Sequence, residues 1–279
     1  MATNHFLSSM KIKFLVLFTS IFFSLSISAQ REVTTFMGIP IDGTTENMIR
    51  ELNNKNFKLL SQHGYNGNII MEGMFNGDWA QIMIFHNRNL VHSIVVSIRL
   101  TGAKAAKTAF NHIHAQMSRS WKYWPHQDSS IPYIPNNADI DYELRCDNDK
   151  YKLDFSQVFT QSIQVEALKQ TMVVKGINPD EYTIQEKNKE LFAFNLVQKQ
   201  QKHTAHLINE LSALEDIDSH EFRAKTNELN EAMKNAENDA KKDLENRVVS
   251  ISLKRILMEN FAILITYTNP YNFPNGEDL

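Results

Sequence analysis

The sequence predicts an α+β fold in which antiparallel sheets are flanked by helices, arranged as two similar halves with a long helical hairpin inserted in the second. Three observations support this prediction. Alternating apolar and polar residues, separated by short turns, occur in both halves of the chain. Each group of predicted strands adjoins a segment with apolar residues at helical spacing. Residues 185–246 contain no Gly or Pro, which favours long helices.

The N-terminus predicts an export signal. Lys11 and Lys13 precede an apolar run at 14–27, and small residues follow at Ser28 and Ala29. The run is shorter than the roughly 20 apolar residues of a membrane-spanning helix. We expect residues 1–29 to be a signal peptide cleaved near Ala29-Gln30, leaving a periplasmic or extracellular chain without a membrane span. Translation starts at Met1 or Met10, and the alternative is an uncleaved membrane anchor.

Composition excludes some classes of function. The chain has 279 residues, of which 42% are hydrophobic and 22% charged, as in ordinary globular proteins. Its formal net charge is −3 and it has no basic run, so we expect no nucleic-acid partner. The single cysteine, Cys146, excludes an internal disulfide and is expected to pack on a strand. The chain has no phosphate-binding glycine loop, nucleophile elbow, HExxH or CxxC motif, so we expect no cofactor, and catalysis is the less favoured interpretation.

The pattern of residues 30–120 predicts a first domain that consists of a helix, a three-stranded meander and a second helix. An extended segment at 33–41 is followed by a turn, after which Thr44 caps a helix that ends at Lys55-Asn56. Strands are expected at 68–75, 79–86 and 90–100, with a helix at 103–119. In the third strand, apolar residues alternate with polar ones, which predicts a sheet with one covered and one wetter face.

Residues 121–138 predict an irregular connection between the halves, because aromatic residues are interleaved with prolines. The aromatic residues are Trp121, Tyr123, Trp124 and Tyr133. Exposed rings on such a segment can stack on sugars or grip a peptide. The alternative is that they pack against the sheet edges.

The pattern of residues 139–279 predicts a second half of the fold, which also contains antiparallel strands. A strand hairpin is expected at 140–146 and 151–159, followed by a helix that ends near Gly176. The helical hairpin occupies 185–246, with a break at 215–219 where Asp218 and Glu221 resemble a capping box. Two closing strands are expected at 247–256 and 261–268.

Several short segments resemble an uncharacterised family of exported bacterial proteins. They are the stretch Phe36-Met37-Gly38-Ile39-Pro40-Ile41-Asp42-Gly43-Thr44, the helix end Lys55-Asn56-Phe57, the meander that follows and the tail Asn275-Gly276-Glu277-Asp278-Leu279. The resemblance covers most of the mature chain except the helical hairpin, and it implies no activity. The chain has Asn56 where glycine would be usual at the helix end.

Three acidic residues alternate along the strand predicted at 140–146. Asp139, Asp141 and Glu143 would lie on one face of that strand and could support paired-carboxylate catalysis or hold a cation. The alternative is a polar outer face of the sheet.

Histidines give two further candidates. His203, His206 and Glu210 are spaced i, i+3 and i+7, so they share one helix face and could bind a metal ion; the alternative is a solvated face. His112 and His114 lie too far apart around a helix to share an ion.

The sequence therefore favours an exported, non-catalytic binding or envelope-associated protein, with a glycan or an envelope protein as its partner. One alternative is a secreted hydrolase that uses the acidic residues near 139–143. The other is a structural or assembly protein that acts through the helical hairpin.

Overall fold

The computed structural model describes residues 33–62, 67–126, 133–158, 162–181, 183–214, 220–257 and 259–273. The predicted signal peptide, the predicted break at 215–219 with Asp218, and the tail at 275–279 lie outside these residues. Val33–Leu279 form one compact unit. None of the helices in the described ranges combines the length and the apolar character that a membrane crossing requires.

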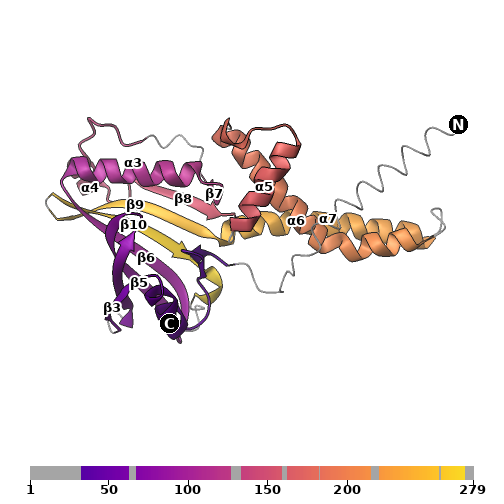
Figure 1. The fold of residues 1–279 in the computed structure, drawn as a ribbon, viewed down its shortest axis with the longest axis horizontal. Coiled ribbons are helices and arrows are strands. Elements are labelled where there is room, and N and C mark those ends of the chain that lie inside the picture. The colour runs from indigo at the N-terminus through magenta and orange to yellow at the C-terminus, as the bar shows by residue number, and fades with distance from the viewer. Residues whose placement is uncertain are drawn as a thin grey trace. The chain divides into compact units, whose positions relative to one another are not determined.

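The α+β prediction is confirmed. Within the described residues, the strands of both predicted halves join in one eight-stranded antiparallel sheet in the order β3-β4-β5-β6-β10-β9-β8-β7 (Figure 1). The strands are β3 (Lys58–Ser61), β4 (Ile69–Phe75), β5 (Asp78–Asn87), β6 (Leu90–Thr101), β7 (Tyr123–Pro125), β8 (Lys152–Gln157), β9 (Val248–Leu257) and β10 (Asn260–Thr268). The two halves meet where β6 pairs with β10, and Ile98 lies opposite Ile263. Two long apolar strands thereby protect each other's backbone from water.

The meander follows the predicted boundaries closely because its turns are chemically specified. Asn76 and Gly77 have φ values of +54° and +90°, and Arg88 and Asn89 have +46° and +68°. Positive φ at both central residues gives the turn twist that suits a tight hairpin.

The first helix also agrees with the prediction. Thr44 caps α2 (Thr45–Asn53) by accepting a hydrogen bond from the Asn47 N–H, and Asn56 adopts φ +66° beyond the helix end. Phe57 then turns inward and is buried. A Cβ atom on Gly73 would lie 2.6 Å from the Phe57 ring, so this position of β4 requires glycine.

One face of the sheet carries the main hydrophobic core. The helix α3 (Ala103–Arg119) packs against β6, β9 and β10 and buries Phe110 and Ile113 (Figure 1). A small two-stranded sheet, β1 (Thr35–Phe36) and β2 (Ile39–Pro40), places the Phe36 ring 5.1 Å from that of Tyr267. Ser97 and Thr266 on the opposite face are half-buried, as the predicted alternation requires.

The strand predicted at 140–146 is wrong, because these residues form the helix α4 (Ile140–Cys146). Asp139 caps the helix by accepting from the Tyr142 N–H, and Ile140 and Leu144 are buried one turn apart. Cys146 is correspondingly exposed at the helix end instead of packed on a strand. The predicted partner strand is present as β8, but it pairs with β7 and β9.

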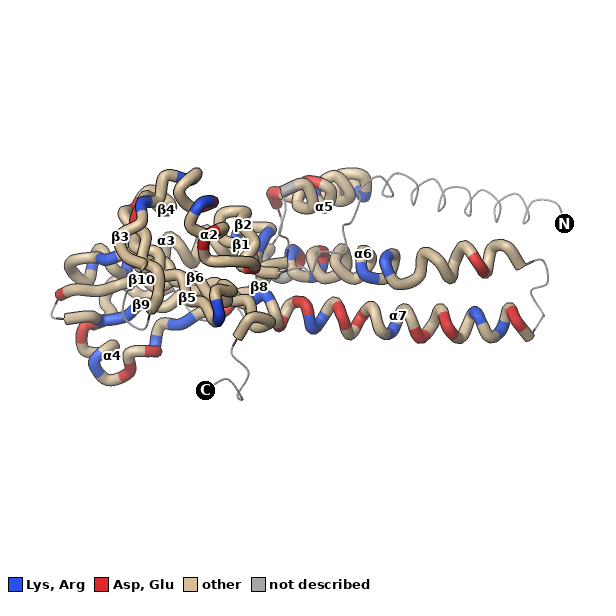
Figure 2. The backbone as a smooth tube through the Cα atoms, turned by 90° about the horizontal axis from the view of Figure 1, so that it is seen from below, with Lys and Arg blue, Asp and Glu red and all other residues tan. Residues whose placement is uncertain are grey.

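The helical part of the second half is confirmed. It comprises α5 (Ser162–Val174), α6 (Ile184–Ala213) and α7 (His220–Asn246), with short 3-10 turns η2 (Pro179–Glu181) and η3 (Pro270–Asn272) elsewhere. Figure 2 shows α6 and α7 side by side, with charged residues along both. Their contact buries Ala236 and Ala240, and ion pairs join Lys199 to Asp243 and Lys225 to Glu210.

Candidate functional site

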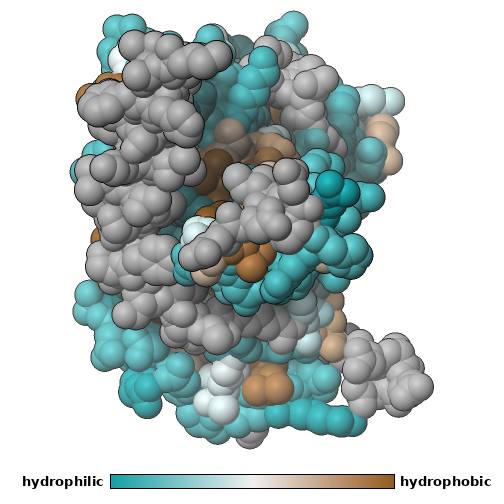
Figure 3. Space-filling model, turned by 90° about the vertical axis from the view of Figure 1, so that its right-hand side faces the viewer, coloured by the Kyte–Doolittle hydropathy of each residue, from teal (hydrophilic) through white to brown (hydrophobic). Residues whose placement is uncertain are grey.

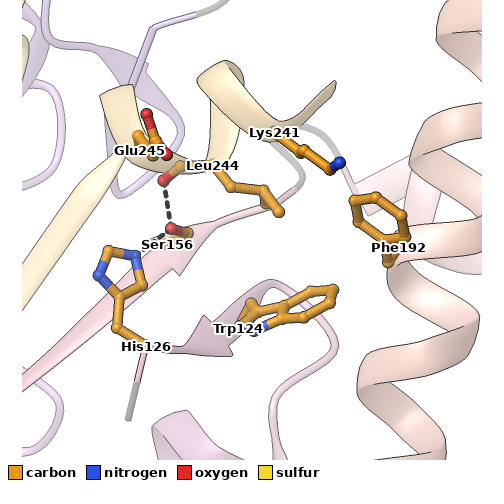
Figure 4. A pocket seen from close by; sticks show the side chains of 7 residues that line it. All are labelled: Trp124, His126, Ser156, Phe192, Lys241, Leu244 and Glu245. Carbon is orange, nitrogen blue, oxygen red and sulfur yellow. Dashed lines mark hydrogen bonds between the residues drawn. The ribbon is translucent and has the colours of Figure 1, made fainter. Parts of the chain in front are cut away.

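A pocket of about 510 Å³ lies where the edge of the sheet meets the helical hairpin (Figure 4). Its lining comes from four elements and one adjoining residue, and consists of Trp124, His126, Ser156, Phe192, Lys241, Leu244 and Glu245. The pocket is an open depression, so a molecule bound there would keep part of its surface in solvent.

The pairing of β7 with β8 orients the indole of Trp124. Trp124 lies opposite Ser156, so both side chains project from the same face of the sheet. Tyr123 projects from the other face into the main core, where its ring lies 6.4 Å from that of Phe155. Pro125 is tolerated because β7 is the edge strand of the sheet.

Two aromatic rings form apolar walls of the pocket. The rings of Trp124 and Phe192 are 5.8 Å apart at 79°, an edge-to-face contact. Trp124 and Leu244 also pack against a second hydrophobic cluster. The buried members of that cluster are Val158, Val165, Leu168, Met172 and Leu191. This cluster joins α5 and α6 to the sheet, so the Trp124 ring rests on a packed support.

A chain of hydrogen bonds at the other end of the pocket joins His126 to Ser156 and Ser156 to the carbonyl oxygen of Leu244 (Figure 4). The Ser156 hydroxyl has one proton, which it donates to Leu244 in the last turn of α7. The Nε2–H of His126 must therefore donate to the Ser156 oxygen. A general base would accept the serine proton, so this polarity supports a helix-capping role for Ser156 and not a nucleophilic one.

The rim of the pocket carries charged groups. Lys241 forms an ion pair with Glu237 at 2.8 Å, and its side chain is 56% exposed. Glu245 follows one turn later on the same face of α7 and also lines the pocket. The pocket thus combines aromatic walls with a rim that can donate and accept hydrogen bonds.

The predicted aromatic group divides between packing and the pocket. Trp121 packs against the second hydrophobic cluster, and Tyr123 packs against the main core. Burial raises the pKa of the Tyr123 hydroxyl. Tyr133 is 49% exposed, and its ring lies 5.1 Å from that of His114. Of the four, Trp124 lines the pocket.

The three acidic candidates have structural partners on and beside α4. Asp139 caps the helix; Asp141 accepts from Arg255 at 2.6 Å, and Glu143 accepts from the Tyr151 hydroxyl. These hydrogen bonds lower the pKa of both Asp141 and Glu143. A general acid at neutral pH needs a raised pKa, so the direction of these shifts does not suit that role.

Two of the three metal candidates, His203 and Glu210, have other partners. His203 Nε2 lies 3.1 Å from a carboxylate oxygen of Asp239, and Glu210 pairs with Lys225. Across the described ranges, no group of three or more His, Cys, Asp or Glu side chains has an arrangement that could hold a metal ion. His112 and His114 both lie on α3, where the helical twist directs their side chains to different faces. Burial lowers the pKa of His114.

Sequence reasoning missed most of the pocket lining, including His126, Ser156, Phe192 and Leu244. Alternation along β8 could have placed Ser156 on the wetter face, but nothing local indicates which helix covers it.

Hydrophobic residues are also visible in a hollow on a mostly hydrophilic face (Figure 3). Exposed apolar side chains on the described helices include Ile163, Val173 and Val174 on α5, and Val197 and Ile208 on α6.

No protein-family model matches the chain, and no curated protein or solved structure shows significant similarity to it.

Proposed function

We propose that the protein is exported and acts as a non-catalytic carbohydrate-binding protein, with its site in the pocket between the sheet edge and the helical hairpin. The observation that carries this proposal is the juxtaposition of the Trp124 and Phe192 rings with charged side chains on one rim. A sugar ring has an apolar C–H face and a hydroxyl edge. Aromatic walls suit the face, and His126, Lys241 and Glu245 supply donors and acceptors for the edge.

A non-catalytic role is supported by the state of the groups that catalysis would use. The proton of Ser156 is directed to a main-chain carbonyl, and the side chain is fully buried. Asp141 and Glu143 are already hydrogen-bonded and lie on α4, which contributes no residue to the pocket lining. Binding is therefore the simplest use of the pocket.

The test is binding of an oligosaccharide array by the mature chain beginning at Gln30, followed by calorimetric titration of the best-bound oligosaccharide. We expect Trp124→Ala to weaken binding by roughly five- to thirtyfold, because stacking on one aromatic ring contributes on the order of 1–2 kcal/mol. Trp79→Ala is the control, since Trp79 is 56% exposed on β5 and does not line the pocket.

Two outcomes would contradict the proposal. One is unchanged oligosaccharide binding by Trp124→Ala. The other is an array without any bound oligosaccharide while a peptide array gives binding that depends on Trp124, which would assign the pocket to a peptide. Export is tested separately by cell fractionation and mass spectrometry; unprocessed chain in the cytosol would contradict it.

Assembly through α6 is a second candidate function. Val197 and Ile208 are 49% and 50% exposed and lie eleven residues apart, which places them on the same face of the helix. A second copy of the chain could cover this face by pairing hairpins. Light scattering should then give a dimer mass that falls to a monomer mass in Val197→Ser with Ile208→Ser. A monomer mass for the unaltered chain would contradict assembly but leave the carbohydrate proposal intact.

A further inference from the structure

Lys187 is a buried cation near the start of α6. Its side chain follows the capping box that Thr183 and Glu186 form at the N-terminus of the helix, and the residue is only 4% exposed. A positive charge in the first turn of a helix opposes the helix dipole, so α6 itself gives no reason for a lysine here. The reason lies in the element against which the ammonium group packs.

The Lys187 ammonium lies at the C-terminal end of α3. It donates to the carbonyl oxygens of Ser118 at 2.5 Å, Ser120 at 3.0 Å and Tyr123 at 3.4 Å. The last carbonyls of a helix have no partner within it and carry the negative end of the dipole. Burial lowers the pKa of Lys187 to about 8, which still leaves most of the population charged at neutral pH.

All three acceptors are main-chain oxygens, so the contact fixes backbone positions. Tyr123 immediately precedes Trp124 on β7, and Phe192 follows Lys187 by five residues on α6. The ammonium therefore ties the strand that carries one aromatic wall of the pocket to the helix that carries the other. The edge-to-face contact of the two rings and the second hydrophobic cluster also join these elements, and the ammonium adds a directed polar contact to the backbone of the strand.

We propose that Lys187 is a positioning residue that holds the Trp124 and Phe192 walls at the spacing a ligand requires. The proposal rests on the proposed function only for its ligand, because the spacing is a property of the free protein. Lys187→Met keeps the length of the side chain but removes the charge and the donors. Lys187→Arg keeps the positive charge and the hydrogen-bond donors. Lys189→Met is a control at an exposed lysine on the same helix.

The experiment is ¹⁹F NMR of the chain labelled with 5-fluorotryptophan, with the three resonances assigned by Trp→Phe substitution. In Lys187→Met we expect the Trp124 resonance to shift and broaden while that of Trp79 stays in place. Lys187→Arg should restore much of the original spectrum, and Lys189→Met should leave it unchanged. Binding of the best oligosaccharide should weaken by about tenfold in Lys187→Met without a comparable loss in Lys189→Met.

Three results would overturn the proposal. An unchanged Trp124 resonance in folded Lys187→Met would show that the ammonium does not position this wall. Failure of Lys187→Arg to restore any of a perturbed Trp124 resonance would assign the effect to packing. Global unfolding of Lys187→Met would make the contact a requirement of the whole fold. Because the spectrum is recorded without ligand, absence of oligosaccharide binding would contradict the proposed function and not the positioning role.

Discussion

The sheet and the helical hairpin are stabilised in different ways, and the pocket lies at their junction. The sheet body buries a continuous set of large apolar side chains, such as Phe36, Ile263 and Phe110. The helical hairpin buries fewer large apolar side chains: Leu207 of α6 is buried, α7 buries Ala236 and Ala240, and ion pairs join the two helices. Apolar burial contributes far more per residue than surface ion pairs do. A site at the junction can therefore combine a wall on the sheet with a helical wall that the second hydrophobic cluster and a few polar contacts hold in place.

The largest effect is expected from removing a core ring of the sheet body. Phe36 is fully buried and packs against Phe75 and Tyr267, with ring centroids 5.6 and 5.1 Å away. Phe36→Ala should lower the free energy of unfolding by about 3–5 kcal/mol, measured by urea denaturation. Phe273→Ala is the control, because this residue is 41% exposed. A loss as small as that of the control would contradict the assignment of this core.

The second-largest loss of stability is expected from removing a buried side chain that joins β1 to the large sheet. Gln157 accepts from the Thr35 N–H at 2.6 Å and donates to the Thr35 carbonyl at 3.0 Å. Gln157→Leu leaves both main-chain groups buried without partners and should cost about 2–4 kcal/mol in urea denaturation. Gln81→Leu on the wetter face should be nearly neutral. Equal effects of the two substitutions would contradict the buried contact.

A smaller loss of stability is expected from removing one of the two ion pairs that join α6 to α7, and the two pairs should differ. The Lys199 and Asp243 side chains are 14% and 18% exposed, whereas those of Lys225 and Glu210 are 30% and 50% exposed. Lys199→Met should cost about 1–3 kcal/mol because it leaves a shielded carboxylate without its cation. Lys225→Met should leave the melting temperature nearly unchanged. A larger loss of stability in Lys225→Met than in Lys199→Met would show that the hairpin is not held at its base.

Burial also lowers the pKa of His92, but part of the pH dependence of the body is expected to come from His114. Burial lowers its pKa below the ordinary value of about 6.5, so the unfolded chain binds the proton more readily. Stability should therefore fall as pH decreases through about 6.5 towards the lowered folded-state pKa. Urea denaturation at pH 7.5 and 5.5 should show this loss, and His114→Phe should reduce it. An unchanged pH dependence in His114→Phe would contradict the prediction.

Sequence reasoning succeeded where the determinant is local. The α3 boundaries, the Thr44 cap, the left-handed Asn56 and the hairpin turns all depend on residues within a few positions of one another. It failed at 140–146, where the alternating acids matched a strand and the i, i+4 pair Ile140 and Leu144 matched a helix. Seven residues are too few to separate these periods.

The pocket could not be predicted for a different reason. Tertiary packing alone brings its lining together, namely Trp124, His126, Ser156, Phe192, Lys241, Leu244 and Glu245. The aromatic segment at 121–138 indicated one of these residues, Trp124, but gave no information about Phe192 or Lys241. The packing of α7 against β8 and the contact of Phe192 on α6 with Trp124 determine which residues face Trp124.

Titration of the 5-fluorotryptophan-labelled mature chain with the best-bound oligosaccharide would show whether Trp124 contacts the ligand. If the junction pocket is the binding site, the Trp124 resonance should move in a saturable manner, with the same Kd as calorimetry, while the Trp79 resonance stays fixed. Saturable binding by calorimetry with a stationary Trp124 resonance would place the site elsewhere on the protein and contradict the account.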